Sequence, residues 1–118
     1  MPVRSLSSAV FKWPERERVL AAARLWACDL RTLDAAVVRV GCVGSYARGD
    51  WGVGSDLDVI VLLSESDLSR LERYARYYPQ GVPVPVDVWV YTLAEWQDLA
   101  TDSPQLRRRL EREWLELS

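Results

Sequence analysis

The apolar positions of the chain follow two kinds of spacing, one typical of helices and one typical of strands. Between Pro14 and Leu33, apolar residues recur at steps of three and four, which predicts a helix with one buried face. Runs rich in β-branched residues predict three strands, at 36–43, 56–63 and about 84–91. Helical spacing and helix-start signals predict four further segments: a turn at 45–48, a helix at 66–78, a short helix opened by the Thr92 to Glu95 capping box, and a last helix from Ser103 to Leu117.

The order helix, strand, strand, helix, strand, helix, helix predicts an α/β (α+β) domain around a small mixed sheet. We expect the helices mainly on one face of that sheet, against its apolar side. Residues 1–13 show no sustained period and are expected to form an N-terminal arm, with 14–118 as a single domain. A chain of 118 residues can bury one core of its own but is short for two.

The charge balance and the cysteines narrow the class of protein. The chain has 15 basic and 17 acidic residues, a net charge of −2, whereas general nucleic-acid binders usually carry a basic excess. No apolar run is long enough to span a membrane, and the first residues lack the order of a secretion signal, so we expect a cytoplasmic protein. Cys28 and Cys42 stand in no metal-binding spacing and are expected to be buried free thiols.

The complete absence of histidine restricts the possible chemistry. Ser-His and Cys-His nucleophile pairs are excluded, and so is a histidine-ligated zinc site. Any catalysis must therefore depend on carboxylates, hydroxyls, arginines, backbone amides or a bound hard metal ion.

Three carboxylates are the strongest candidates for such chemistry. Asp56 and Asp58 are two residues apart on a predicted strand, so their side chains point to the same face. Asp87 lies on the next predicted strand, on the face opposite its valines. If the two strands are neighbours, the three carboxylates converge, an arrangement that is costly unless a cation lies between them. Oxygen ligands favour magnesium or manganese, and phosphoryl-transfer sites often hold two such ions ~3.5–4 Å apart.

A turn that fits a phosphate group precedes these carboxylates. Gly44 and Ser45 end one predicted strand and begin the helical turn, where free backbone N–H groups and a hydroxyl can hold phosphate oxygens. Glycine at position 44 allows close approach to the backbone. Arg48 can neutralise a phosphate oxygen or the leaving pyrophosphate. Alternatively, Arg48 forms a surface pair with Asp50.

These residues together resemble a known signature. Gly44-Ser45, ten intervening residues and then Asp56-Leu57-Asp58 resemble the motif of the DNA polymerase β-like nucleotidyltransferase superfamily. The fuller strings, Gly-Ser-Tyr-Ala-Arg-Gly and Ser-Asp-Leu-Asp, resemble its small prokaryotic branch, the minimal nucleotidyltransferases. The resemblance implies that Asp56 and Asp58 bind two metal ions and that Asp87 binds the catalytic one and helps to take the proton from the attacking hydroxyl. It also implies that Ser45 holds the terminal phosphates, with Ser55 a weaker candidate.

The same resemblance suggests a partner. Members of this branch often act as the antitoxin of a toxin–antitoxin pair whose toxin is a helical HEPN-domain protein. It implies transfer of AMP from ATP, or of another NMP, to a hydroxyl on that toxin. Larger relatives carry further domains that bind the acceptor; we expect none in these 118 residues, and so expect the acceptor to come with a partner molecule or a second protomer. The alternatives are an inactive antitoxin that neutralises the toxin by binding, and transfer to a small molecule or RNA, which the short chain and acidic balance disfavour.

Two surface features are interpreted with alternatives open. Arg107-Arg108-Arg109 is more consistent with a solvated helix face than with a nucleic-acid patch, because Arg107, Arg109 and Arg112 each stand four residues before a glutamate. Strand alternation also places four apolar residues beside the aspartates: Ile60, Leu62, Trp89 and Tyr91. They form either an exposed patch that binds a partner or a surface covered by a helix or the N-terminal arm.

Overall fold

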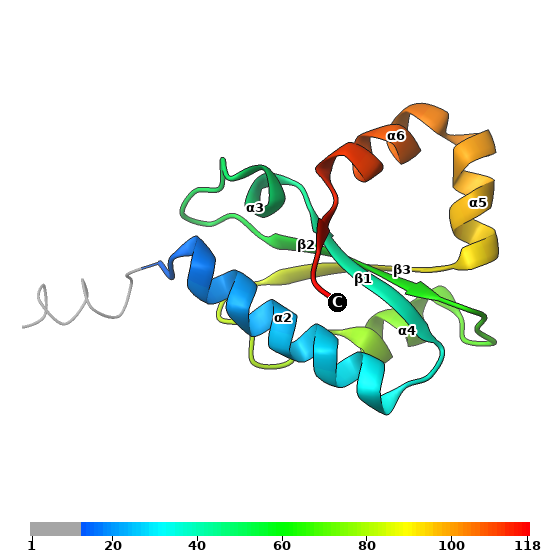
Figure 1. The fold of residues 1–118 in the computed structure, drawn as a ribbon, viewed down its shortest axis with the longest axis horizontal. Helices are drawn as coiled ribbons and strands as arrows, with labels where there is room; N and C mark the ends of the chain where they lie inside the picture. Colours follow the sequence, from blue (N-terminus) through cyan, green and yellow to red (C-terminus); the bar gives the residue numbers. More distant parts are fainter. Residues whose placement is uncertain (1–12) are drawn as a thin grey trace, which may run out of the picture.

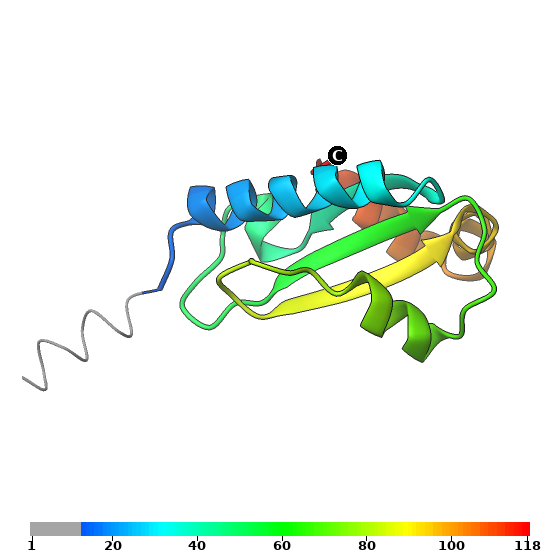
Figure 2. The same ribbon diagram turned by 90° about the horizontal axis from the view of Figure 1, so that it is seen from below.

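The structure is a computed structural model that describes residues 13–118, so the arm expected at the N-terminus lies almost wholly outside the described residues. Four strands form one mixed sheet in the spatial order β3-β2-β1-β4 (Figure 1). β1 pairs antiparallel with β2 and β4, whereas β2 and β3 run side by side in the same direction (Figure 2). The strands are β1 (Val37–Val43), β2 (Leu57–Leu63), β3 (Val86–Thr92) and β4 (Leu115–Glu116). The predicted mixed α/β architecture is confirmed.

The helices divide between the two faces of the sheet (Figure 1). α2 and α4 pack against one face, as expected, but α5 and α6 fold back over part of the other, and α3 is a single turn after β1. The bounds are α2 (Arg16–Leu33), α3 (Ser45–Arg48), α4 (Arg70–Tyr77), α5 (Leu93–Asp102) and α6 (Pro104–Glu113). We call the face under α2 and α4 the closed face and the other the open face.

The closed face holds the main core. Val59, Val61 and Leu63 alternate along β2 and are 0% exposed. α2 covers them with Val19 and Ala23 of the stripe that its spacing predicts, and also with Leu20 and Ala27. Leu33, the last residue of the predicted stripe, is 86% exposed because the helix ends there, beyond the core. This fully buried apolar interior fixes β2, and with it Asp58 near the start of the strand and Asp56 just before it.

The open face is only partly covered. Ile60 and Leu62 are 1% and 2% exposed, because they pack with Trp96 of α5 and Leu110 of α6. Of the two alternatives for the four apolar residues beside the aspartates, an exposed patch is therefore wrong for Ile60 and Leu62, which helices cover. Trp89, by contrast, remains 47% exposed beyond the edge of that cluster.

Two helices have other bounds than the sequence predicts. α4 begins at Arg70 rather than at residue 66, because the Ser66 hydroxyl accepts a hydrogen bond from the Leu68 amide and Ser69 caps the helix in a box with Glu72. The last helix ends at Glu113, before the residue 117 that its pattern predicts.

The chain beyond α6 instead forms β4, which is fixed by contacts to β1. Trp114 lies against Gly41, at a position where any Cβ would overlap its ring, and the Arg39 guanidinium stacks 4.4 Å from the centre of that ring. Arg39 also forms a salt bridge of 2.8 Å with Glu116. The i,i+4 spacing predicts that Glu116 pairs with Arg112, but Glu116 lies in β4 and not in the helix. These contacts draw the C-terminal segment into the sheet.

The two cysteines differ in environment. Cys42 is buried as expected, and burial raises the pKa of its thiol to about 12, so it stays protonated. The expectation of burial is wrong for Cys28, which is exposed because it lies outside the buried stripe of α2. Among residues 13–118, no helix combines the length and apolar character needed to cross a membrane.

Candidate active site

Two of the predicted carboxylates are brought together by the parallel pairing of β2 and β3. Asp58 and Asp87 are register partners in adjacent strands, and both side chains lie on the open face, half-buried. Side chains of register partners on the same face are close neighbours. Asp56 lies just before β2 and is exposed, at the solvent edge of the same region.

The electrostatics of Asp58 show how crowded this region is with negative charge. Burial raises the pKa of the Asp58 carboxyl, and the charges of Asp87, Asp56 and Glu113 raise it further. Arg48 is the nearby positive charge that opposes this shift. The ionised form of Asp58 is therefore held at an energetic cost within the isolated chain.

The donor set fits a hard divalent cation, although it does not form a finished cage. The ligands are carboxylate oxygens, which magnesium and manganese prefer, and a cation would offset the repulsion around Asp58. Within residues 13–118, however, no group of three or more acidic or cysteine side chains is arranged to hold a metal by itself. Phosphate oxygens of a nucleotide would then have to complete the coordination shell.

Gly44 is required at the turn before α3. Its φ is +77°, which L side chains rarely adopt, and a Cβ built there would overlap the carboxylate of Asp58. Ser45 follows as the first residue of α3 and is half-buried. The turn therefore brings Gly44 against the carboxylate of Asp58.

Of the two other predicted phosphate-binding residues, Arg48 lines a cavity beside Asp58, whereas the Ser55 side chain bonds within the glycine loop. The Arg48 guanidinium pairs with Asp50 at 3.1 Å and with Glu113 at 3.0 Å, so the pairing that the sequence left open is present. Arg48 still lines the same cavity as Gly44 and Asp58. The Ser55 hydroxyl instead accepts a hydrogen bond of 2.9 Å from the Gly52 amide and closes the glycine loop.

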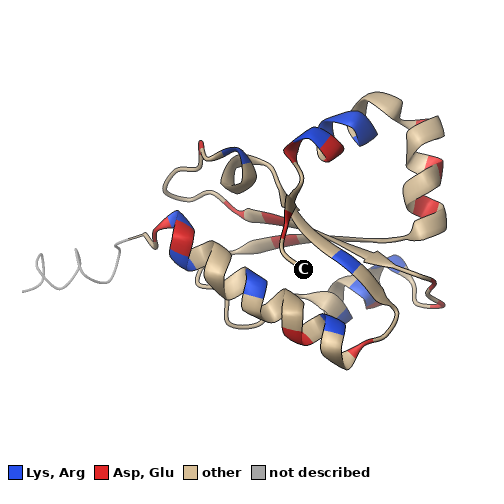
Figure 3. Ribbon diagram, viewed as in Figure 1, with Lys and Arg blue, Asp and Glu red and all other residues tan. Residues whose placement is uncertain are grey.

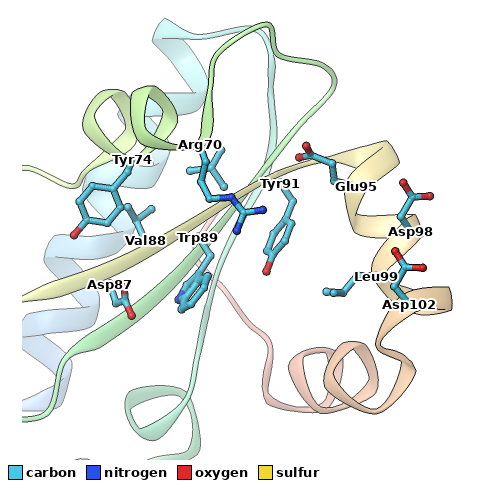
Figure 4. Close-up of a pocket in the computed structure, with 11 residues that line it drawn as sticks. Arg70, Tyr74, Asp87, Val88, Trp89, Tyr91, Glu95, Asp98, Leu99 and Asp102 are labelled. Carbon is cyan, nitrogen blue, oxygen red and sulfur yellow. The ribbon is translucent and has the colours of Figure 1, made fainter.

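Two cavities flank the open face of β3. The first, of about 340 Å³, is bounded by the turn at Gly44, by Asp58 and by α6. The second, of about 430 Å³, lies between β3, α4 and α5, with Asp87 at one end and Tyr91 nearer the other (Figure 4). Trp89 and Tyr91 line both cavities, so the aromatic side chains of β3 separate them.

Glu113 and Arg109 of α6 are site residues that the sequence does not predict. Both line the first cavity, and the Glu113 carboxylate accepts a hydrogen bond of 3.0 Å from the Gly44 amide, 69 positions earlier in the chain. Their i,i+4 spacing predicts a surface pair with each other. Glu113 pairs with Arg48 instead, because the helix ends there and leans toward α3, where the acidic end of α6 faces the basic end of the turn (Figure 3).

A mixed sheet with acidic residues on neighbouring parallel strands and a glycine turn beside them is the architecture of a nucleotidyl-transfer domain. A family model described as "Nucleotidyltransferase domain" matches residues 27–115, which include every candidate site residue, and the chain belongs to this family. The comparison with curated proteins finds no match.

Two solved structures share the fold. A candidate nucleotidyltransferase from Sulfolobus solfataricus is 23% identical, with a TM-score of 0.56, over 70% of this chain and 75% of that one. A structure described as "the toxin-antitoxin with AMP-PNP" is 19% identical, with a TM-score of 0.55, over 89% of this chain and 73% of that one. At these identities the similarity shows the fold, and the chemistry must be argued from the site.

Proposed function

We propose that this chain transfers AMP from ATP to a hydroxyl of a partner protein, in a reaction that depends on magnesium or manganese. The observation that carries the proposal is the register pairing of Asp58 with Asp87 beside the Gly44 turn. Asp56, Asp58 and Asp87 are the residues that would hold the metal. When bound, the metal would neutralise phosphate oxygens and stabilise the leaving oxygen.

In the proposed reaction the acceptor hydroxyl oxygen attacks the α-phosphorus of ATP. The bond from that phosphorus to the oxygen bridging to the β-phosphate breaks, and pyrophosphate leaves. The hydroxyl proton passes to the carboxylate of Asp87, which lines the cavity next to the first one. The Gly44 amide, the Ser45 hydroxyl and Arg48 would hold the phosphates; Gly44 and Arg48 line the first cavity, and Ser45 follows Gly44 as the first residue of α3.

The second cavity suits the acceptor. It begins at Asp87 and contains the exposed Trp89, and exposed aromatic side chains are common anchors of protein interfaces. A partner that buries Trp89 would bring its hydroxyl to the end of the cavity where the proton is accepted. We propose a HEPN-type toxin as this partner, in keeping with the shared fold of a solved toxin–antitoxin complex.

A transfer assay tests the proposal. The chain is incubated with magnesium, ATP labelled at the α-phosphate, and the protein encoded beside it, and label is expected on that protein. Asp58→Asn should abolish labelling, whereas Asp29→Asn, an exposed change of the same kind on α2, should not. Parallel reactions with GTP, CTP and UTP identify the base. If the two proteins form a stable complex but no label is transferred, the proposed enzyme activity is overturned, and an antitoxin that acts by binding alone is favoured.

A further inference from the structure

Glu113 occupies the part of the site where an anion is expected. Its Oε1 accepts a hydrogen bond of 3.0 Å from the Gly44 amide, and its Oε2 lies 3.0 Å from the Arg48 guanidinium. The side chain is only 15% exposed, although Glu113 is the last residue of a helix on the molecular surface. One carboxylate thus binds the Gly44 amide and Arg48, one of the two arginines that line the first cavity beside Asp58.

We propose that Glu113 holds the place of a nucleotide phosphate in the resting protein, so that a nucleoside triphosphate must displace it to bind; this inference rests on the proposed function. A carboxylate and a phosphate present the same kind of oxygen acceptor to an N–H donor and a guanidinium. The Gly44 amide has a single hydrogen, so Glu113 and a phosphate oxygen compete for it. Arg48 has several N–H donors, and Glu113 holds the Nη1 group of Arg48 in the same resting contact. The contact is therefore autoinhibitory.

The position of Glu113 makes its release feasible. It lies at the C-terminal end of α6, so rotation of its side chain breaks no hydrogen bond within the helix. Arg109 stands one turn earlier, lines the same cavity and has the i,i+4 spacing of a helical ion pair with Glu113. Arg109 offers Glu113 an alternative partner when phosphate takes its place.

The experiment measures the binding of Mg·ATP and of inorganic tripolyphosphate to the full chain by calorimetry. Glu113→Gln keeps the size and one acceptor oxygen but loses the charge that pairs with Arg48, and Glu113→Ala removes both contacts. The Kd should be highest for the wild type, lower for Glu113→Gln and lowest for Glu113→Ala. The overall decrease should be roughly tenfold if Glu113 fills the site about nine-tenths of the time, because only one protein molecule in about ten is then free to bind. Tripolyphosphate should show the same order, since it carries the phosphates without the base.

Glu111→Gln is the matched control. It makes the same chemical change two residues away on α6, and in the structure Glu111 forms a salt bridge of 3.3 Å with Arg107, outside the first cavity. Its Kd values should equal those of the wild type. Melting curves followed by circular dichroism confirm that each variant is folded.

The outcomes separate the two proposals. If the wild type binds Mg·ATP and the Glu113 variants bind it equally or more weakly, the inference is overturned while the proposed function stands. Tighter binding in Glu111→Gln as well would also overturn it, because a general loss of negative charge would then be the cause. If no form of the protein binds Mg·ATP or tripolyphosphate, the proposed function fails, and the inference fails with it.

Discussion

On the closed face of the sheet Val59, Val61 and Leu63 are fully buried beneath α2, whereas on the open face Asp58 is half-buried and Trp89 is 47% exposed. Along β2 the buried residues alternate with Asp58, and Trp89 lies on the open face of the neighbouring strand β3. One face is closed by apolar packing, and the other is left with charge and an aromatic surface that nothing in residues 13–118 covers completely.

One carboxylate in each region shows what this difference means. At the end of α2, Asp34 accepts a hydrogen bond of 2.8 Å from the Tyr77 hydroxyl of α4, and this bond lowers the pKa of its carboxyl. On the open face, burial and neighbouring negative charges raise the pKa of Asp58. A charge that stabilises the fold has partners, whereas one kept without adequate partners points to a ligand that supplies them.

The largest expected effect is on the open face. Asp58→Asn should reduce transfer by at least ~10²–10⁴-fold, the range for loss of a group that acts directly in a reaction. It should leave the free energy of unfolding unchanged or slightly higher, because it removes repulsion and keeps the size of the side chain. Urea denaturation and the labelling assay measure the two quantities. A strongly destabilised variant would show instead that Asp58 is a structural residue.

The reverse pattern is expected on the closed face. Leu63→Ala should lower the free energy of unfolding by about 2–5 kcal/mol, because it leaves a cavity at a side chain that is 0% exposed. At a temperature where the variant is still folded, its Kd for Mg·ATP should match the wild type. The control is Leu25→Ala on α2, where the side chain is 66% exposed and the change in stability should stay within about 0.5 kcal/mol.

This division of roles could be predicted from the sequence only in part. Period-two alternation places Asp58 and Asp87 opposite the valine face, and the structure pairs them as expected. The metal, the nucleotide and the roles of Ser45 and Ser55 remain predictions.

The placement of α5 and α6 could not be predicted in the same way. Their apolar spacing identifies which side of each helix is buried, but it does not identify the sheet face that Trp96 and Leu110 cover. For that reason the sequence leaves open whether Ile60 and Leu62 are exposed or covered by a helix, and the structure shows that α5 and α6 cover them. The contact of Glu113 with Gly44 is even harder to predict from the sequence. It depends on where α6 ends and on the packing of two segments that are far apart in the chain.

Trp89→Ala tests whether the exposed part of the open face serves recognition. Association with the acceptor protein should weaken by about 30-fold, which corresponds to ~2 kcal/mol for an aromatic anchor. The stability should change little, since the side chain is 47% exposed. The affinity for Mg·ATP should stay close to that of the wild type, because the proposed metal and phosphate contacts come from other residues. Calorimetric titration with the partner gives the first quantity. Unaltered association would place the acceptor elsewhere, for example along the loop at 50–54.

The smallest expected effect is the pH dependence of stability, where the two carboxylates should differ in sign. The folded-state pKa of Asp34 lies below its ordinary value of 3.8, so Asp34 stabilises the fold at higher pH, and this contribution is lost as the pH falls through the folded pKa. Asp34→Asn should therefore be less stable than the wild type at neutral pH, by about 1 kcal/mol as for one hydrogen bond, and the gap should close in acid.

For Asp58 the folded-state pKa is raised, so ionisation destabilises the fold once the pH exceeds its ordinary value. Asp58→Asn should then be the more stable protein at neutral pH, and its advantage should disappear as the pH falls and the wild-type carboxyl is protonated. Urea denaturation followed by tryptophan fluorescence, from neutral pH down to about pH 2, measures both differences, because the contribution of Asp34 is lost only below its ordinary pKa of 3.8. If both Asn variants were more stable than the wild type at neutral pH, or both less stable, the contrast between the two faces would be contradicted. The surroundings would then have the same effect on the ionised form of both aspartates.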